Sequence, residues 1–201
     1  TGGGLVRTTS VTLLVQNAAT GSGTDVNIGS PAIAGSASAS GGVFTVSGAG
    51  SDIWQASDQF NFNYWPVTGD ATITARVKSI TNTNFYAKAG VMIRESLNPN
   101  STFAFAVAIP TLFNFHYRLS TAGSAASGPY FNVSYPMWLR LVRSGTTFTA
   151  YSSPDGQAWT QINSPVSINM ASPAYVGLAV TSHDVTKLNT AVFDNVVITQ
   201  P

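Results

Sequence analysis

Cysteine is absent from the 201 residues, and charged residues are scarce. Without cysteine the chain has no disulfide, no thiol nucleophile and no thiolate zinc site. Lys, Arg, Asp and Glu together make up 8% of the residues, against about 25% in an average soluble domain. Glu95 is the only glutamate among the eight acidic residues. Because the apolar fraction is 44%, the chain can nevertheless build a folded core.

The same composition argues against nucleic acid and membranes as partners. The formal net charge is +1, and the Lys and Arg residues are scattered, so a basic patch for nucleic acid is missing. No stretch approaches the roughly 20 apolar residues of a membrane-spanning helix. We therefore expect neither a nucleic-acid nor a membrane partner.

Alternation of apolar and polar residues is the dominant pattern. In Ala71–Ile80 the residues Ile73, Ala75 and Val77 fall on one face, which is the period of a β-strand. Turn sequences such as Ser153–Gly156 separate these runs, and no twelve-residue window has a helical period. The pattern predicts an all-β fold with two antiparallel sheets in a sandwich. The other predicted strands are Val43–Ser47, Tyr86–Arg94, Phe103–Ile109, Phe113–Leu119, Met137–Arg143, Thr147–Ser152, Ala158–Ile162, Tyr175–Thr181 and Asn189–Thr199.

Composition divides the chain into residues 1–24, a tail and linker, and residues 25–201, the β-sandwich module. Within the first part, Val6–Val15 has the pattern of a strand, and the Ala-, Gly-, Ser- and Thr-rich Asn17–Thr24 has the composition of a linker. Two interpretations of Val6–Val15 stay open. It is either the last strand of a preceding immunoglobulin-like module or an edge strand of this domain.

Several spaced motifs from about Asp25 to Thr199 resemble one family of modules. The motifs are Asn27–Ala32, Ser51–Trp54, Asp58–Phe60, Gly69-Asp70, Lys88–Glu95, Ser153–Trp159, Val176–His183 and Phe193–Val196. Together they resemble the concanavalin A-like, laminin-G-like β-sandwich accessory modules of secreted bacterial polysaccharide-degrading enzymes. The resemblance implies a jelly-roll, concanavalin A-like sandwich outside the cell. It also implies two partners, which are a polysaccharide and an appended catalytic domain.

The acidic residues argue for holding polysaccharide rather than cutting it. Glycosidases place two carboxylates about 5–9.5 Å apart across the scissile bond. One glutamate and scattered aspartates do not form the Glu-x-Asp row of catalytic sandwiches, so we expect no catalytic residue and no enzyme activity. A polysaccharide lyase, with a His or Tyr base, is a less favoured alternative, because His116 and Arg118 share one strand face while Tyr117 points away. A structural or adhesive spacer domain is the main alternative.

Aromatic and amide-rich segments are the candidate sugar-binding surface. Sugar rings stack their C–H faces on aromatic rings, and their hydroxyls need polar partners at the rim. In Phe60–Pro66 alternation places Phe60 and Phe62 in the core, and leaves Asn63 and Trp65 on a face that we expect to be exposed. The candidate ligand-binding residues are Trp65, Tyr64, Asn63, Tyr86, Arg94, Glu95, His116, Tyr130, Tyr135 and His183. For Arg94 and Glu95, a structural pair with other residues of the sheet is an equal alternative.

The remaining tryptophans and several aspartates have structural interpretations. Trp54, Trp138 and Trp159 lie in alternating or family-like motifs, so we expect them in the core. We expect no cofactor. A structural calcium ion stays open, although no EF-hand-like spacing supports it. Its candidate ligands are Asp25, Asp52 and Asp194.

Overall fold

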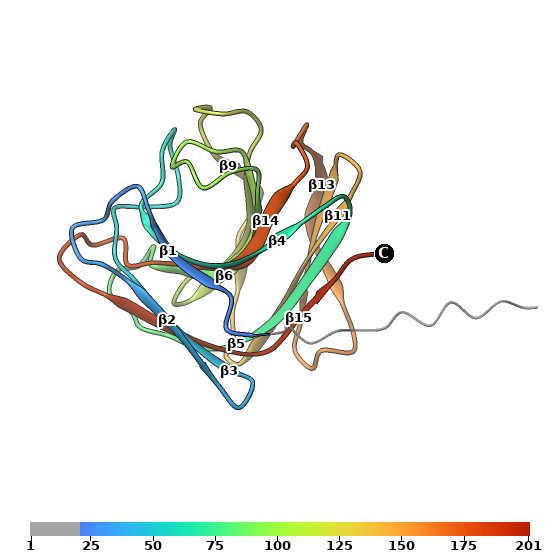
Figure 1. Cartoon of the computed structure of the whole chain (residues 1–201). Coiled ribbons are helices and arrows are strands. Elements are labelled where there is room, and N and C mark those ends of the chain that lie inside the picture. The colour runs from blue at the N-terminus through green and yellow to red at the C-terminus, as the bar shows by residue number, and fades with distance from the viewer. Residues whose placement is uncertain (1–20) are drawn as a thin grey trace, which may run out of the picture.

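The computed structural model describes residues 21–201, and it is built from two antiparallel β-sheets that pack face to face (Figure 1). One sheet has the order β1 (Thr24–Ile28), β4 (Phe60–Val67), β14 (Ala174–Thr181), β6 (Lys88–Arg94), β7 (Phe103–Ala108), β8 (Leu112–Arg118) and β10 (Phe131–Asn132), with β9 (Ala126–Ser127) also paired to β8. The other has the order β13 (Thr160–Ser167), β12 (Thr147–Ser153), β11 (Met137–Ser144), β5 (Ala71–Ile80), β15 (Asn189–Thr199), β3 (Val43–Gly48) and β2 (Ser36–Ser40).

This architecture confirms the predicted all-β, two-sheet antiparallel sandwich. Each of the ten predicted strands overlaps an observed one. The two alternatives for Val6–Val15 concern residues outside the described part of the chain. Within residues 21–201, no helix is long and apolar enough to cross a membrane.

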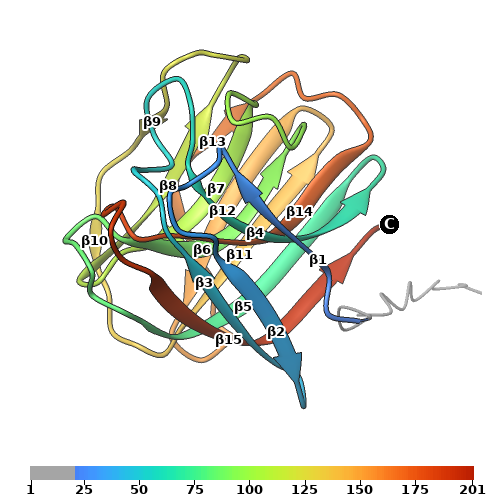
Figure 2. The ribbon, with the colours of Figure 1, turned by 60° about the vertical axis from the view of Figure 1, so that its left-hand side comes forward.

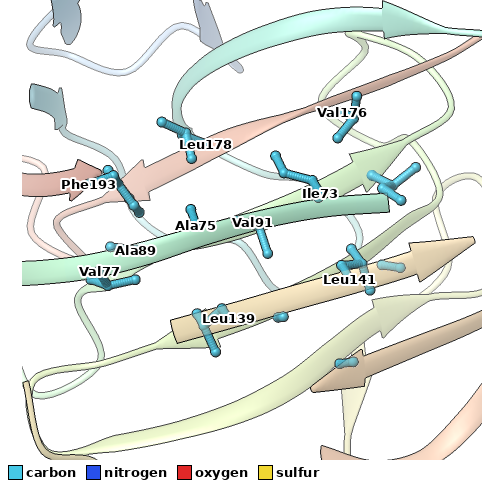
Figure 3. Close-up of a cluster of buried hydrophobic side chains, with 14 of the residues drawn as sticks. Ile73, Ala75, Val77, Ala89, Val91, Leu139, Leu141, Val176, Leu178 and Phe193 are labelled. Atoms are coloured by element: carbon cyan, nitrogen blue, oxygen red, sulfur yellow. The ribbon is translucent and has the colours of Figure 1, made fainter. Parts of the chain in front are cut away.

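The main core lies between the sheets and follows from strand alternation. Figure 3 shows side chains of β5, β11 and β15 meeting those of β6 and β14. Ile73 and Leu141 occupy paired positions on β5 and β11, and both are fully buried. Val91 and Leu178, paired across β6 and β14, face them from the other sheet. Because these side chains exclude water from both sheets, the core fixes the sheets as one rigid support.

A second core covers the outer side of the eight-stranded sheet. Phe62, Met92 and Phe105 point away from the seven-stranded sheet, and yet they are fully buried. Ile53 and Ala125, which lie in the loops after β3 and β8, pack over them. These loops rise on the outer side of the sheet in Figure 1. Consequently both faces of this sheet are covered, and a functional surface there must be built largely from loops.

Candidate functional site

A pocket of about 380 Å³ opens on the loop-covered side of the eight-stranded sheet. Its floor is made by Lys88 of β6 and His116 of β8, both buried. Alternation turns these side chains outward, because their neighbours Ala89 and Phe115 point into the core between the sheets. Loop residues complete the lining of this loop pocket, namely Asp52, Trp54, Gln55, Tyr86, Tyr130 and His183.

His116 is held neutral at the bottom of the loop pocket. Its ring meets the Trp54 ring edge-on at 4.9 Å, and its Nε2 lies 3.1 Å from Tyr130 Oη. Burial lowers the pKa of His116 to about 3, and the nearby charge of Lys88 acts in the same direction. Nδ1 is buried and has no hydrogen-bond partner among the described residues. A neutral imidazole thus lies beneath the tyrosine hydroxyl at ordinary pH.

An ion-paired group forms the second part of the floor. The Lys88 ammonium donates to Asp52 Oδ1 at 2.5 Å and to the Tyr86 carbonyl at 3.1 Å. Asp52 Oδ2 lies 3.3 Å from His183 Nε2. Burial lowers the pKa of Lys88, although the carboxylate of Asp52 opposes this effect. The pair therefore sets a fixed donor and a fixed acceptor side by side, which is the arrangement that recognises adjacent sugar hydroxyls.

Two tyrosine rings form the rim of the loop pocket. Tyr86 is 47% exposed and Tyr130 is 39% exposed. Tyr86 lies in the loop after β5, beside the loop after β14 (Figure 2), where Thr83 Oγ1 donates to the Ser182 carbonyl at 2.8 Å. The rings of Tyr86 and His183 are 5.5 Å apart. Such rings offer apolar faces to a sugar, while the floor offers hydrogen bonds.

Backbone conformation at the loop pocket is unusual at two positions. Gln55 has φ 43° and His183 has φ 51°, which for residues other than glycine is the sparsely populated left-handed region. Each such residue costs about 1–3 kcal/mol and persists only where its surroundings determine it. The fold thus maintains strained backbone on two sides of this pocket, as functional sites often do.

A buried ionic cluster anchors the wall that carries Trp54 and Gln55. Asp58, Arg94 and Arg118 are all fully buried. Asp58 Oδ1 accepts from Arg118 Nη2 at 2.6 Å, and Oδ2 lies 3.4 Å from Arg94 Nη1. Arg118 Nη2 also donates to the carbonyls of Trp54, at 2.7 Å, and Gln55, at 2.9 Å. The cluster therefore fixes the loop after β3 against the sheet.

Four of the predicted ligand-binding residues meet in this one place. Tyr86, His116, Tyr130 and His183 come from different parts of the chain and all line the loop pocket. Their role in binding stays a prediction. What the structure adds is that they share one cavity.

The prediction that Asn63 and Trp65 lie on an exposed face is wrong. Asn63 is 2% exposed, and the indole of Trp65 packs edge-on against Phe44, with the ring centroids 5.8 Å apart, against the core between the sheets. Tyr64 points to the opposite face, where it stacks on Phe62 at 5.6 Å. Both faces of β4 are thus covered, and none of these three predicted residues lines the loop pocket.

Three further predicted residues make structural contacts instead. Arg94 is fully buried beside Asp58, so its prediction as a ligand-binding residue is wrong, and the alternative of a structural pair describes it. The Glu95 carboxylate accepts from Thr102 Oγ1 at 2.8 Å and from the Ala171 amide at 3.0 Å, which joins two loops. Tyr135 Oη donates to the Ile109 carbonyl at 2.7 Å. None of these predicted residues lines the loop pocket.

Four of the eight residues that line the loop pocket are not among the predicted ligand-binding residues. Trp54 is expected in the core, but it is partly buried and forms a wall of the loop pocket. Asp52 is predicted only as a candidate calcium ligand, and neither Lys88 nor Gln55 is predicted to have a role. One signal was available for Lys88, because it is a charged residue in the otherwise apolar run Lys88–Ile93.

Metal ligands do not gather in the described part of the chain. Residues 21–201 contain no group of three or more His, Cys, Asp or Glu side chains that could hold a metal ion. Asp52 pairs with Lys88, and Asp194 pairs with Arg76 at 2.6 Å. The candidate carboxylates at these two positions already face cations of the protein, and structural calcium stays a prediction.

Comparisons with known proteins agree with the fold. No protein-family model and no curated protein sequence matches the chain. Among solved structures, a functionally unknown protein from Saccharomyces cerevisiae has a TM-score of 0.70 at 17% identity, covering 90% of this chain and 97% of that one. The carbohydrate-binding module CBM66 from Bacillus subtilis has a TM-score of 0.57 at 17% identity, covering 89% of this chain and 97% of that one.

A third similar structure belongs to a longer protein. Xylan β-1,4-xylosidase from Bacillus halodurans C-125 has a TM-score of 0.57 at 11% identity, and the match covers 79% of this chain but 33% of that one. At these identities the similarities show a shared β-sandwich fold, which the carbohydrate-binding module and the xylosidase have in common with this chain.

Proposed function

We propose that this chain is a non-catalytic carbohydrate-binding module that holds polysaccharide in the loop pocket. The observation that carries the proposal is the pocket's construction. Two exposed tyrosine rings, Tyr86 and Tyr130, stand over a floor of fixed hydrogen-bonding groups on His116, Lys88 and Asp52. Apolar rings combined with a few convergent polar groups are what a sugar needs for affinity and for orientation.

The shape of the loop pocket favours the end of a sugar chain as ligand. Its volume of about 380 Å³ lies near the lower end of the roughly 300–1,000 Å³ typical of small-molecule sites. Its lining comes from four loops around two strand residues, so the pocket is surrounded by loops and does not follow one strand face. Such a site suits one or two terminal sugar residues.

The context that we propose is an extracellular enzyme with several domains. A binding module raises the effective concentration of polysaccharide near a tethered catalytic domain. The names of CBM66 and of the xylosidase, which share this fold, are consistent with such a role. An appended catalytic domain and a secreted protein are therefore part of the proposal.

Binding without hydrolysis follows from the acids in the loop pocket. Asp52 is the only carboxylate in its lining, whereas glycosidases use two. The same carboxylate is already paired with Lys88 and His183. The lining also contains a neutral His116 beside Tyr130, which is the residue combination of a lyase, and a test for lyase products will show whether it has catalytic activity.

Removing the Tyr130 ring is expected to weaken sugar binding about 5- to 150-fold, which corresponds to about 1–3 kcal/mol for a lost stacking ring. The measurement is calorimetric titration of wild type and Tyr130→Ala with the oligosaccharides that the wild type retains from a polysaccharide panel. Phe131→Ala is the matched control. Phe131 is 41% exposed, close to the 39% of Tyr130, but it stacks on Phe113 and does not line the pocket.

Three outcomes would contradict the proposal. Folded wild type that binds no polysaccharide of a broad panel would favour the spacer alternative. Equal losses in Tyr130→Ala and Phe131→Ala would remove the site from the loop pocket. Unsaturated products that absorb in the ultraviolet would show a lyase instead of a binding module.

A further inference from the structure

The outer face of the seven-stranded sheet carries a second cluster of aromatic and charged side chains. Register places Trp138 beside Arg76, and Arg76 beside Asp194, across β11, β5 and β15. Two residues farther along β11 and β5, Arg140 lies beside Thr74. All of these residues alternate with core residues, so their side chains point away from the other sheet. The expectation that Trp138 and Trp159 lie in the core is therefore wrong, since both are partly exposed on this face.

A cleft of about 200 Å³ is formed within this cluster. Its lining residues are Thr74, Trp138, Arg140, Gly156, Trp159, Asn195 and Val197. Gly156 permits the close approach of its turn, because a Cβ there would lie 2.7 Å from the Trp138 ring. On the other side, the register of β15 shifts between Asp194 and Val197, which places Asn195 at φ 50° in the lining. Such a register shift is a β-bulge, and bulges often lie beside functional sites, where they redirect a side chain. We refer to this site as the arginine cleft.

Arg140 is held in place but is not neutralised. Its guanidinium carbon lies 3.8 Å from the centroid of the Trp159 ring, and its Nε donates to Thr74 Oγ1 at 3.0 Å. Among the described residues, its two terminal nitrogens have no hydrogen-bond partner, and no carboxylate lies within ion-pair distance. By contrast, Arg76 on the same face is bound by both oxygens of Asp194, at 2.7 and 2.6 Å. Burial lowers the pKa of Arg140, although the neighbouring Tyr151 opposes this effect.

Charge on this face also favours an anion. On the outer face of β5, β11 and β15, Arg76, Lys78 and Arg140 contribute three positive charges against the one negative charge of Asp194. A further carboxylate, that of Asp155, lies in the turn beside Gly156, where it accepts from the amides of that turn. The whole chain has a formal net charge of +1. A guanidinium stacked on an aromatic ring presents its outer N–H groups as a rigid fork, which matches a carboxylate.

We propose that the arginine cleft is a second binding site, which takes a sugar residue that carries a carboxylate, such as a uronic acid. The terminal nitrogens of Arg140 donate to the two carboxylate oxygens. The sugar ring contacts the parts of Trp138 and Trp159 that line the cleft, since the guanidinium of Arg140 covers one face of Trp159. The volume of the cleft suits one sugar residue. This site is separate from the loop pocket, since the two share no lining residue and lie on opposite sheets. The chain would accordingly hold a polysaccharide at two places.

The test is titration with oligomers of galacturonate, glucuronate and mannuronate, and with the same oligomers after reduction of the carboxyl groups. Wild type is expected to bind at least one acidic oligomer and to bind its reduced counterpart about 10- to 100-fold more weakly, as for the loss of a charge-assisted pair. Arg140→Gln is expected to lose affinity for the acidic oligomer by the same factor. Arg140→Lys keeps the charge but not the fork, and it is expected to recover only part of the loss.

Matched variants separate this site from the loop pocket. Lys78→Gln removes one positive charge from the same face of the sheet, on the neighbouring strand β5. Its side chain is 44% exposed, and the change should alter the affinity less than about threefold. Tyr130→Ala should leave binding of the acidic oligomer in the arginine cleft unchanged. If wild type binds no acidic oligomer, or if folded Arg140→Gln binds it as wild type does, the second site is overturned. Binding of neutral sugars in the loop pocket would survive either result.

Discussion

Replacing Asp58 with asparagine is expected to lower the free energy of unfolding by about 3–5 kcal/mol. Asp58 lies between Arg94 and Arg118, and all three residues are fully buried. Its carboxylate is the only acidic group that faces these two guanidinium groups in ion-pair contact within the described chain. An amide of the same size cannot balance two buried positive charges, so both would remain uncompensated in a medium of low dielectric constant.

The other contacts of the cluster increase this effect. Arg118 Nη1 donates to the Ser101 carbonyl at 2.9 Å, and Arg94 Nη2 donates to the Asn98 carbonyl at 2.6 Å. The Asp58 amide itself donates to the Pro99 carbonyl at 2.9 Å. The cluster thus joins the loops after β3 and β6 to the sheet, and its loss would release the wall of the loop pocket together with the second core.

Urea unfolding of wild type and Asp58→Asn measures this change. Asp194→Asn is the matched control, because it removes the carboxylate from an Arg–Asp pair of similar geometry in which the Arg76 side chain is 32% exposed. The Asp194 side chain is only 12% exposed, but its partner arginine is in contact with water, so we expect the control to cost less than Asp58→Asn, about 1–2 kcal/mol. Equal losses in the two variants would mean that burial of the cluster adds nothing to its effect on stability, which would contradict the prediction.

Strand positions could be predicted because alternation is a local property of the sequence. The run Ala71–Ile80 shows this most clearly, since its predicted inner face, with Ile73, Ala75 and Val77, is fully buried between the sheets. Five observed strands, β1, β2, β4, β9 and β10, are not among the ten predicted ones, and two of them show the reason. Ser36–Ser40 consists of Ser and Ala alone and carries little periodic signal, while Thr24–Ile28 spans the predicted boundary between the linker and the module. Small, weakly patterned edge strands depend on their neighbours for their structure.

The choice of the exposed face could not be made from one strand. Alternation correctly separates Phe62 from Asn63 and Trp65, but it does not show that loops cover one face of the sheet and the other sheet covers the second. Arg94 illustrates the same limit, because its partner Asp58 lies 36 residues away in the sequence. Tyr86, Tyr130 and His183 are candidates because of their aromatic or imidazole rings, and the structure places all three in loops that line one pocket. Their role in binding stays a prediction. Which of them meet is a consequence of topology.

Acid is expected to destabilise the protein through His116. Its pKa is about 3 in the folded protein, whereas an unfolded histidine has a pKa of about 6.5. Above pH 6.5 both states are neutral at this residue, and the stability is fully present. As the pH falls below 6.5, His116 is protonated in the unfolded chain but stays neutral in the folded protein. Stability is therefore lost progressively down to about pH 3.

The size of this loss follows from the difference between the two pKa values. One proton corresponds to about 1.4 kcal/mol per pH unit, so His116 alone removes on the order of 4 kcal/mol between pH 6.5 and pH 3. His116→Gln, which cannot take up this proton, should therefore lose less stability than wild type over this range. Urea unfolding of both proteins at half-unit steps of pH measures this difference in the free energy of unfolding. Both proteins contain the same carboxylates, so the contributions of these groups cancel in the comparison.

Tyr130→Phe distinguishes burial from hydrogen bonding as the cause. It removes the hydroxyl that lies 3.1 Å from His116 Nε2, but it leaves the ring of Trp54 and the charge of Lys88 in place. Because desolvation is the largest contribution to the lowered pKa, this variant should keep the pH dependence of the wild type. If the dependence disappears with the hydroxyl, the hydrogen bond to Tyr130 is what keeps the imidazole neutral. If wild type and His116→Gln respond equally to acid, the imidazole is not desolvated, and the floor of the loop pocket is open to water.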